Sequence, residues 1–318
     1  MWTNGGAAAS SACHLPPPMP LHLAPLSRRE FLRRSLAASA GALTLRASAA
    51  QADPDRWALF SDTHIAGDRA AISRAVNMTA HLQAAVAEVR ALAVPPVGLM
   101  VNGDCSLDHG LPEDYATFIE LLAPFREAAL PLHFTLGNHD ERNVFWASLK
   151  DTRPATPPLA SKHVSVIESA RANWFLLDSL DVTKATPGRL GDEQRAWLAQ
   201  ALDARPGKPA LLMVHHNPIA PAGKKAGLLD TAELLALAAP RRQVKAIFYG
   251  HTHTWRCAEQ DGVHLVNLPA VAYPFTPMEV TGWVDCKLRD GGATLELRAH
   301  NPEHAAHGKV TELAWRAA

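Results

Sequence analysis

Six short apolar runs recur after residue 50, and longer amphipathic segments separate most of them. The runs are WALF, VGLMV, LHFTL, WFLLD, ALLMV and KAIFY, beginning at residues 57, 97, 132, 174, 210 and 245. Apolar runs of this length predict buried strands, whereas apolar residues three or four positions apart predict helices. Strands that alternate with helices along the chain predict an α/β fold.

Helical patterns are expected over residues 71–93, 111–129, 190–204 and 230–240. From residue 262 to residue 298 the pattern changes to strand-like pieces, VHLVNL, GWVDCKLR and ATLELRA, with Asp-Gly turns. A strand-rich end after an alternating segment predicts two packed sheets. With no internal repeat or low-complexity linker in this part, a single domain with a strand-rich C-terminal part is expected over residues 50–318.

The residues before position 50 have a different character. Residues 27–50, SRREFLRRSLAASAGALTLRASAA, contain the pair Arg28 and Arg29, a mildly apolar stretch, and the small residues Ala47, Ser48 and Ala49. This order resembles a twin-arginine export signal and predicts that residues 1–49 are removed. The export machinery is then a partner, and the location is periplasmic or extracellular. The alternatives are a basic amphipathic helix of the mature protein and, for the start codon, Met19 in place of Met1.

Charge and hydropathy narrow the function classes. The 31 basic and 31 acidic side chains balance, which does not favour nucleic acid or an anionic membrane as a partner. No stretch after residue 50 reaches the roughly 18 apolar residues of a membrane span. The spacing of Cys105, Cys257 and Cys286 is not that of a zinc ribbon, and whether a disulfide forms stays open.

Side chains of the types that bind metal ions come immediately after five of the expected strands. The segments are SDTH at 61–64, NGD at 102–104, GNHD at 137–140, HHN at 215–217 and GHTH at 250–253. The carboxyl ends of strands in an α/β sheet meet along one crevice, so these side chains should converge. On an extended backbone His251 and His253 would point to the same side. Singly such residues are helix caps, turn formers or core histidines, but together they predict a metal site.

The motif order D-x-H, G-D, G-N-H-D, H and G-H-x-H over residues 56–274 resembles the calcineurin-like metallophosphoesterase superfamily. The resemblance implies a four-layer αββα sandwich with two packed mixed sheets. It also implies two metal ions and a ligand set. One ion takes Asp62, His64 and His253, the other takes Asn138, His215 and His251, Asp104 bridges the two, and His139 lies beside them.

The implied function is metal-dependent hydrolysis of a phosphoric ester, with a metal-bridging hydroxide as the nucleophile and Asp104 and His139 as catalytic residues. Carboxylate, amide and imidazole ligands favour Fe and Mn, with Zn as the alternative. His139 is expected to steady the transition state or protonate the leaving oxygen, and its alternative role is to orient a ligand. His216 is expected to pack or to support a ligand, and Cys105 to be a small buried residue.

The segment NGDCSLDHGLPEDYATF resembles the class III cyclic-nucleotide phosphodiesterases and their glycerophosphodiesterase relatives, which predicts a small phosphodiester substrate. Leu107 stands where purple acid phosphatases place a tyrosine, so an iron-tyrosinate site is not expected. Phosphomonoester hydrolysis at the same site is the alternative activity, and a non-catalytic metal-binding protein is the alternative of another class. Export argues against control of cytosolic cyclic AMP. The natural substrate, metal identity and oligomeric state stay open.

Overall fold

The first apolar run forms a strand with a different hydrophobic cluster packed against each of its two faces. In β1 (Asp53–Ser61), Trp57 and Leu59 pack into one core cluster, whereas Ala58 and Phe60 pack into another. Side chains of a strand alternate between its two faces, so a strand that is buried on both faces is apolar throughout. The run WALF therefore marks a strand between two layers.

The first sheet is mixed and has six strands. Its order is β14-β13-β12-β1-β4-β5, with β1, β4 and β5 parallel and the other three joined antiparallel. Besides β1 its strands are β4 (Pro96–Asn102), β5 (Leu132–Thr135), β12 (Gly282–Arg289), β13 (Gly292–Ala299) and β14 (Val310–Ala314). The strand-rich end of the chain thus completes the sheet that the first strands begin.

The second sheet also has six strands and is mixed, in the order β10-β11-β9-β8-β7-β6. Strands β7, β8, β9 and β11 run parallel, and β6 and β10 lie antiparallel at the edges. The strands are β6 (Ser165–Glu168), β7 (Asn173–Leu176), β8 (Ala210–Met213), β9 (Val244–Tyr249), β10 (Arg256–Gln260) and β11 (Val263–Asn267). Trp174 and Phe248 of this sheet share a core cluster with Trp57 of β1, so the two sheets pack face to face.

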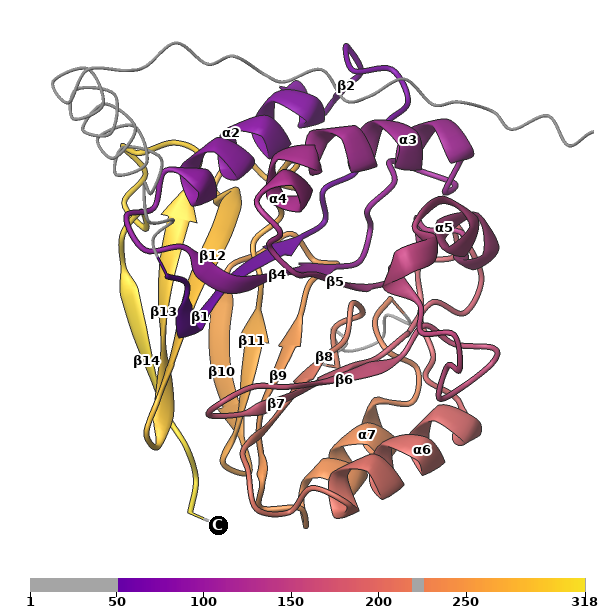
Figure 1. Cartoon of the computed structure of the whole chain (residues 1–318), viewed down its shortest axis with the longest axis vertical. Helices are drawn as coiled ribbons and strands as arrows, with labels where there is room; N and C mark the ends of the chain where they lie inside the picture. Colours follow the sequence, from indigo (N-terminus) through magenta and orange to yellow (C-terminus); the bar gives the residue numbers. More distant parts are fainter. Residues whose placement is uncertain (1–50, 219–225, 318) are drawn as a thin grey trace, which may run out of the picture. The chain divides into compact units, whose positions relative to one another are not determined.

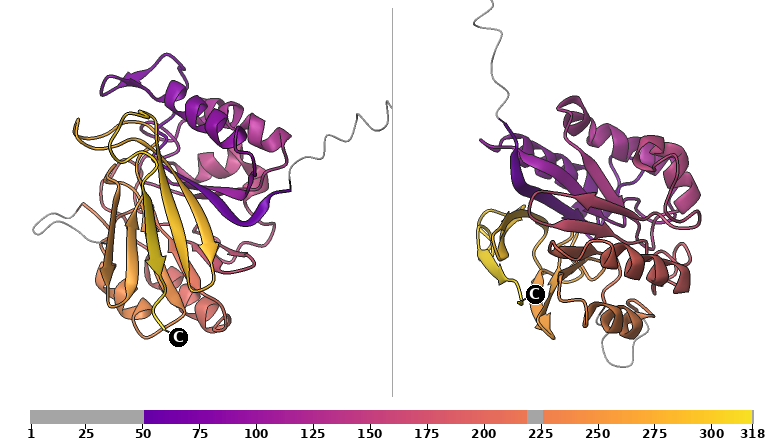
Figure 2. Two further views of the ribbon diagram at one scale, coloured as in Figure 1. Left: turned by 90° about the vertical axis from the view of Figure 1, so that its left-hand side faces the viewer. Right: turned by 60° about the horizontal axis from the view of Figure 1, so that its bottom comes forward.

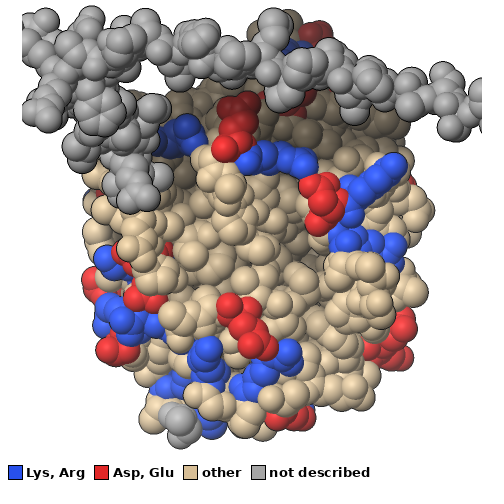
Figure 3. Space-filling view, in the orientation of Figure 1, with Lys and Arg blue, Asp and Glu red and all other residues tan. Residues whose placement is uncertain are grey.

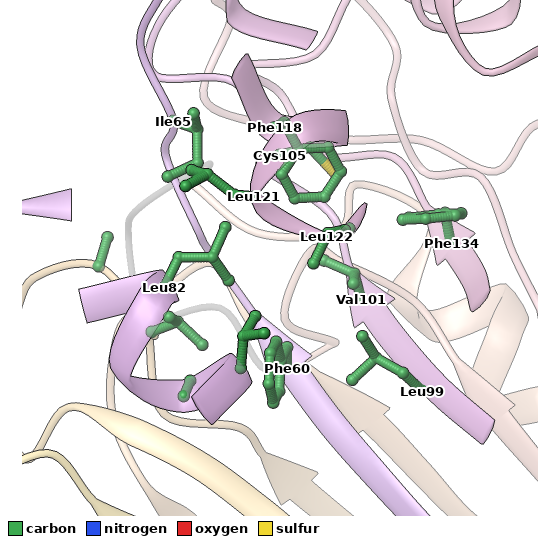
Figure 4. Packing of buried hydrophobic residues seen from close by; sticks show 14 of the residues in the cluster. Phe60, Ile65, Leu82, Leu99, Val101, Cys105, Phe118, Leu121, Leu122 and Phe134 are labelled. Carbon is green, nitrogen blue, oxygen red and sulfur yellow. The ribbon is translucent and has the colours of Figure 1, made fainter. Parts of the chain in front are cut away.

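Helices cover the outer face of each sheet (Figure 1). The first group comprises α2 (Met78–Arg90), α3 (Pro112–Leu121), α4 (Ala123–Glu127) and α5 (Arg142–Ser148), followed by the short 3-10 helix η1 (Lys150–Thr152). Figure 4 shows part of this packing, with Leu82 near Phe60 and Leu122 beside Val101 of the first sheet. The second sheet carries α6 (Asp192–Asp203) and α7 (Thr231–Ala238). The expected four-layer arrangement of two mixed sheets is confirmed.

Two expected helices differ from the structure. Residues 72–77 form a hairpin of β2 (Ile72–Ser73) and β3 (Val76–Asn77), and the helix begins only at Met78. Arg74 and Ala75 have φ of 49° and 65°, a left-handed conformation that no α-helix contains. The expected helix over 111–129 divides into α3 and α4, because Pro124 has no N–H to continue the first helix. The patterns did not predict α5, β6, β10 or β14.

The computed structural model describes residues 51–218 and 226–317, which belong to one compact unit, Ala50–Ala318. The expected export signal at residues 1–49 lies outside the described residues and stays a prediction. Within the described part, no helix has the length and hydrophobicity of a membrane span. On the face drawn in Figure 3, acidic and basic side chains lie in small mixed groups.

Candidate metal centre

The loops after the parallel strands of both sheets meet around one cavity of about 500 Å³. Six of the eight predicted site residues line it, namely His64, Asp104, Asn138, His139, His251 and His253. The other two, Asp62 and His215, are fully buried. The structure therefore brings all five sequence motifs to one place, as expected from the strand ends.

A first group of possible metal ligands consists of Asp62, His64 and His253. His253 Nε2 lies 3.3 Å from Asp62 Oδ1 and 3.1 Å from His64 Nε2. The Nδ1 atom of each histidine faces a backbone carbonyl oxygen, Leu107 O for His64 and Tyr273 O for His253. With Nδ1 donating to a carbonyl, both Nε2 atoms carry lone pairs, and these lone pairs repel each other unless a cation lies between them.

A second group consists of Asp104, His215 and His251. His215 Nε2 lies 3.3 Å from Asp104 Oδ2 and has no hydrogen-bond partner among the described residues. Asn138 lines the same cavity, and its buried Oδ1 likewise has no partner in the described part of the chain. Asp104 Oδ2 is also 3.6 Å from His64 Nε2, so this carboxylate adjoins both groups.

These residues fit two metal ions on the structure's own geometry. Two imidazole nitrogens that share one ion at about 2.1 Å are roughly 3.0–3.4 Å apart, and the two Nε2 atoms of His64 and His253 have this separation. A metal-binding histidine normally donates its other N–H to a carbonyl or carboxylate. His215 Nδ1 faces Asn102 O at 2.9 Å, and His251 Nε2 faces Ala226 O at 2.8 Å. Each candidate histidine is thus oriented through its second nitrogen.

Left-handed backbone conformations concentrate at the candidate ligands. Among the described residues, ten that are not glycine have a positive φ, and half of them are Asp62, His64, Asp104, His251 and His253. Each such residue costs about 1–2 kcal/mol, which is a cost typical of functional sites. The expected extended backbone at GHTH is therefore wrong. Turns at both histidines direct His251 toward Asp104 and His215, and His253 toward Asp62 and His64.

Glycine is required where two site loops touch. A Cβ atom at Gly137 would lie 2.1 Å from Asp104 Oδ1, and one at Gly250 would lie 2.5 Å from Asp62 Oδ2. Both contacts are far closer than atoms can approach, so any side chain there would displace a candidate ligand.

Burial and neighbouring charges set the ionisation of the candidate ligands. Burial disfavours the charged form of Asp104, yet His215 holds the pKa of this carboxyl well below its usual range. Burial opposes the charge on His215 too, but Asp104 and Asp62 raise its pKa to about 10. Burial lowers the pKa of His64 to about 3 and that of His251 to about 4. Ionised carboxylates and neutral imidazoles are the forms that bind metals, so Asp104, His64 and His251 are in the binding form, whereas His215 must release its proton when an ion binds.

Asp140 of the GNHD motif ties two site loops together, a role that sequence reasoning did not assign. Its buried carboxylate accepts from the backbone N–H groups of Gly137 at 2.9 Å and Cys105 at 3.1 Å, and from the Tyr115 hydroxyl at 3.0 Å. Burial raises the pKa of Asp140 to about 6. Cys105 is fully buried, and burial raises the pKa of its thiol well above the usual value, as expected of a small buried residue.

His139 lies at the edge of the ligand groups with its side chain partly open to solvent. Its ring centre is 4.9 Å from that of His64, and its backbone N–H donates to Asp104 Oδ1 at 2.9 Å. Its Nδ1 is 3.7 Å from Asp108 Oδ1, and Lys184 also contacts that carboxylate.

His216 is buried against the rings of His215 and His251, with its Nδ1 2.7 Å from Ser179 Oγ, so it packs behind the ligands as expected.

The comparison with protein families decides the identity of the site. Residues 56–255 match the family of calcineurin-like phosphoesterases. The chain belongs to this family. The assignment confirms the family and the enzyme class predicted from the motif order: the protein is a metallophosphoesterase, a hydrolase of phosphoric esters.

Curated relatives of this calcineurin-like phosphoesterase include several phosphodiesterases. It is 32% identical over 226 residues to 3′,5′-cyclic adenosine monophosphate phosphodiesterase CpdA of Pseudomonas aeruginosa, covering 69% of this chain and 76% of the relative. It is 28% identical over 250 residues to CpdA of Haemophilus influenzae, covering 76% and 84%. A cAMP/cGMP dual specificity phosphodiesterase of Mycobacterium tuberculosis is 26% identical over 254 residues, covering 79% and 77%.

Solved structures share the fold at low sequence identity. A dimetal phosphatase from Danio rerio aligns with a TM-score of 0.65 and 14% identity, covering 83% of this chain and all of that one. GAP50, described as the anchor in the inner membrane complex of Plasmodium, aligns with a TM-score of 0.57 and 12% identity, covering 82% and 89%. Because proteins so differently described share this architecture, the fold alone does not specify the activity.

Several residues of the cavity wall were not anticipated from the sequence, and three of them carry an aromatic ring or a guanidinium. Arg74, Tyr273 and Phe275 line the cavity together with the candidate ligands. Arg74 falls in a segment expected to be helical, and the other two follow β11 in residues 268–275, LPAVAYPF, which contain no ligand-type residue. Aromatic and arginine side chains are common throughout proteins, so their residue types carried no signal for a site.

Proposed function

We propose that this metallophosphoesterase hydrolyses phosphodiesters of small molecules at a two-metal centre. The observation that carries the proposal is the position of Asp104, whose carboxylate adjoins both groups of ligand-type residues at the wall of an open cavity. The curated relatives support a diester substrate, since several are named as cyclic-nucleotide phosphodiesterases.

The proposed ligand set follows the two groups. Asp62, His64 and His253 would hold one ion, Asn138, His215 and His251 would hold the other, and Asp104 would serve both. When bound, such a pair of ions supplies a nucleophile at neutral pH and neutralises charge on the phosphoryl group during an in-line displacement. Oxygen and imidazole ligands without thiolate support Fe and Mn, with Zn as the alternative.

His139 and Asp108 are the side chains placed to supply a proton to the leaving group of the substrate. The cavity opens beside His139, whose ring is the partly exposed imidazole next to the ligand groups. From this position its ring can donate a proton to the leaving oxygen of the ester. Asp108, 3.7 Å from Nδ1, lies where it can orient the ring so that the other nitrogen faces the substrate.

Hydrolysis of two chromogenic esters tests the proposed activity. The full chain loaded with Mn²⁺ is expected to hydrolyse bis(p-nitrophenyl) phosphate with a higher kcat/KM than p-nitrophenyl phosphate. Chelation should abolish the activity, and added Mn²⁺ should restore it, because both ions take part in the displacement. A higher kcat/KM for the monoester would replace the proposal by phosphomonoester hydrolysis. Absence of turnover with either ester by protein that retains two ions would favour the non-catalytic alternative.

Metal content of two histidine variants tests the ligand assignment. His251→Ala and His253→Ala are each expected to lower the bound metal by about one ion per chain, because each removes one ligand of a different ion. Elemental analysis gives the stoichiometry, and the spin coupling of a Mn²⁺ pair should disappear in both variants. His264→Ala is the matched control. His264 lies on β11, where it contacts Glu259 and the backbone oxygen of Ala314. Two ions per chain in both site variants would contradict the assignment.

A further inference from the structure

An arginine and two aromatic rings form a continuous wall beside the candidate ligands. Phe275 stacks on His253 with ring centres 4.0 Å apart and ring planes 13° apart, and Tyr273 stacks on His64 at 5.0 Å and 27°. The Arg74 guanidinium lies 4.9 Å from the Phe275 ring centre and 5.8 Å from that of Tyr273. All three line the cavity that holds the candidate ligands. We call Arg74, Tyr273 and Phe275 the aromatic wall.

The backbone at Arg74 adopts a strained, left-handed conformation. Arg74 and Ala75 form the tip of the hairpin between β2 and β3, and both are left-handed. Such two-residue turns prefer asparagine and glycine, so an arginine there is strained. The left view of Figure 2 shows the hairpin projecting near the start of α2. This strained turn places the Arg74 guanidinium at the mouth of the cavity.

The guanidinium is available to a ligand. Across residues 51–218 and 226–317, no carboxylate forms an ion pair with Arg74, whereas the nearby Arg69 is paired with Glu120. Phe275 keeps 46% of its surface exposed although it stacks on His253. His253 stacks on the Phe275 ring and Arg74 lies over it, so the wall offers a ligand the plane of the guanidinium, the exposed part of Phe275 and several hydrogen-bond donors.

From this geometry we propose that the aromatic wall binds the nucleobase of a nucleoside phosphoester whose phosphoryl group lies at the metal centre. A nucleobase is planar, so it can stack on the wall, and its ring nitrogens and carbonyl oxygens can accept hydrogen bonds from Arg74. A choline or ethanolamine group would meet the like charge of Arg74, and glycerol has no ring to stack. The wall therefore selects nucleotide esters over glycerophosphodiesters. This inference rests on the proposed function for the placement of the phosphoryl group.

Calorimetric binding of two probes tests the inference without turnover. The full chain loaded with Mn²⁺ is expected to bind adenosine 5′-monophosphate about tenfold more tightly than inorganic phosphate, because only the nucleotide reaches the wall. Arg74→Met and Phe275→Leu should each remove most of this preference while phosphate affinity changes less than about twofold. Arg69→Met is the matched control and should keep the preference.

The outcomes separate this inference from the proposed function. Equal affinity of the wild-type protein for the two probes, or an equal loss of both affinities in Arg74→Met and Phe275→Leu, would overturn the nucleobase site. Chelation-sensitive hydrolysis of bis(p-nitrophenyl) phosphate without a nucleotide preference would leave the proposed function standing and reject the wall. A nucleotide preference that both variants lose, in protein without diester turnover, would support the wall and reject the proposed function.

Discussion

Asp104→Asn is expected to lower kcat/KM for bis(p-nitrophenyl) phosphate by on the order of 10³-fold. Asp104 Oδ2 lies 3.3 Å from His215 Nε2 and 3.6 Å from His64 Nε2, so its negative charge serves both groups of candidate ligands. Asparagine keeps the size of the side chain and an oxygen that can accept from the His139 N–H. The change therefore removes the charge and leaves the packing in place.

Metal analysis should show that the loss has the expected cause. Asp104→Asn should bind fewer than two ions per chain, because a neutral amide is a weaker bridge than a carboxylate. Asp203→Asn is the control: Asp203 is an exposed acid at the C-terminal end of α6, paired with Arg241 at 2.8 Å, and its loss should change kcat/KM less than about twofold. An Asp104→Asn protein that keeps two ions and at least a tenth of wild-type activity would refute the bridging role.

The ligand groups could be predicted because their chemistry is rare and their position is regular. Each of four candidate ligands lies one or two residues after the end of a strand that reads as apolar, and carboxyl ends of parallel strands converge; the four are Asp62, Asp104, His215 and His251. The local geometry could not be predicted in the same way. The left-handed turns that separate His251 from His253 depend on Gly250 fitting against Ser61 and Asp62, which are distant in sequence.

The hairpin at residues 72–77 shows a second limit of sequence patterns. Ile72 and Val76 are four residues apart and match a helical period, so the segment reads as the start of α2. Arg74 and Ala75 carry no turn signal, because left-handed turns are usually marked by glycine or asparagine. The hairpin's Arg74 instead contacts Tyr273 and Phe275, a tertiary interaction that residue spacing does not reveal.

His139→Ala is expected to lower kcat by about 10²- to 10⁴-fold for a diester with a poorly acidic leaving alcohol, while both ions remain bound. The imidazole is within reach of the ligand groups, 4.9 Å between ring centres from His64, yet it is partly exposed to the cavity. A proton donor to the leaving oxygen needs this combination of proximity and access. Metal content measured beside the rates separates this role from that of a ligand.

The leaving group then distinguishes the two catalytic roles open to His139. If the ring donates a proton, His139→Ala should cost far less for p-nitrophenyl esters, because p-nitrophenolate departs without protonation. If the ring instead stabilises negative charge on the phosphoryl oxygens, both kinds of ester should slow by the same factor. His139→Gln, which keeps a hydrogen-bond donor without a transferable proton, should restore activity only in the second case. Loss of an ion from His139→Ala would contradict both roles and make His139 a ligand.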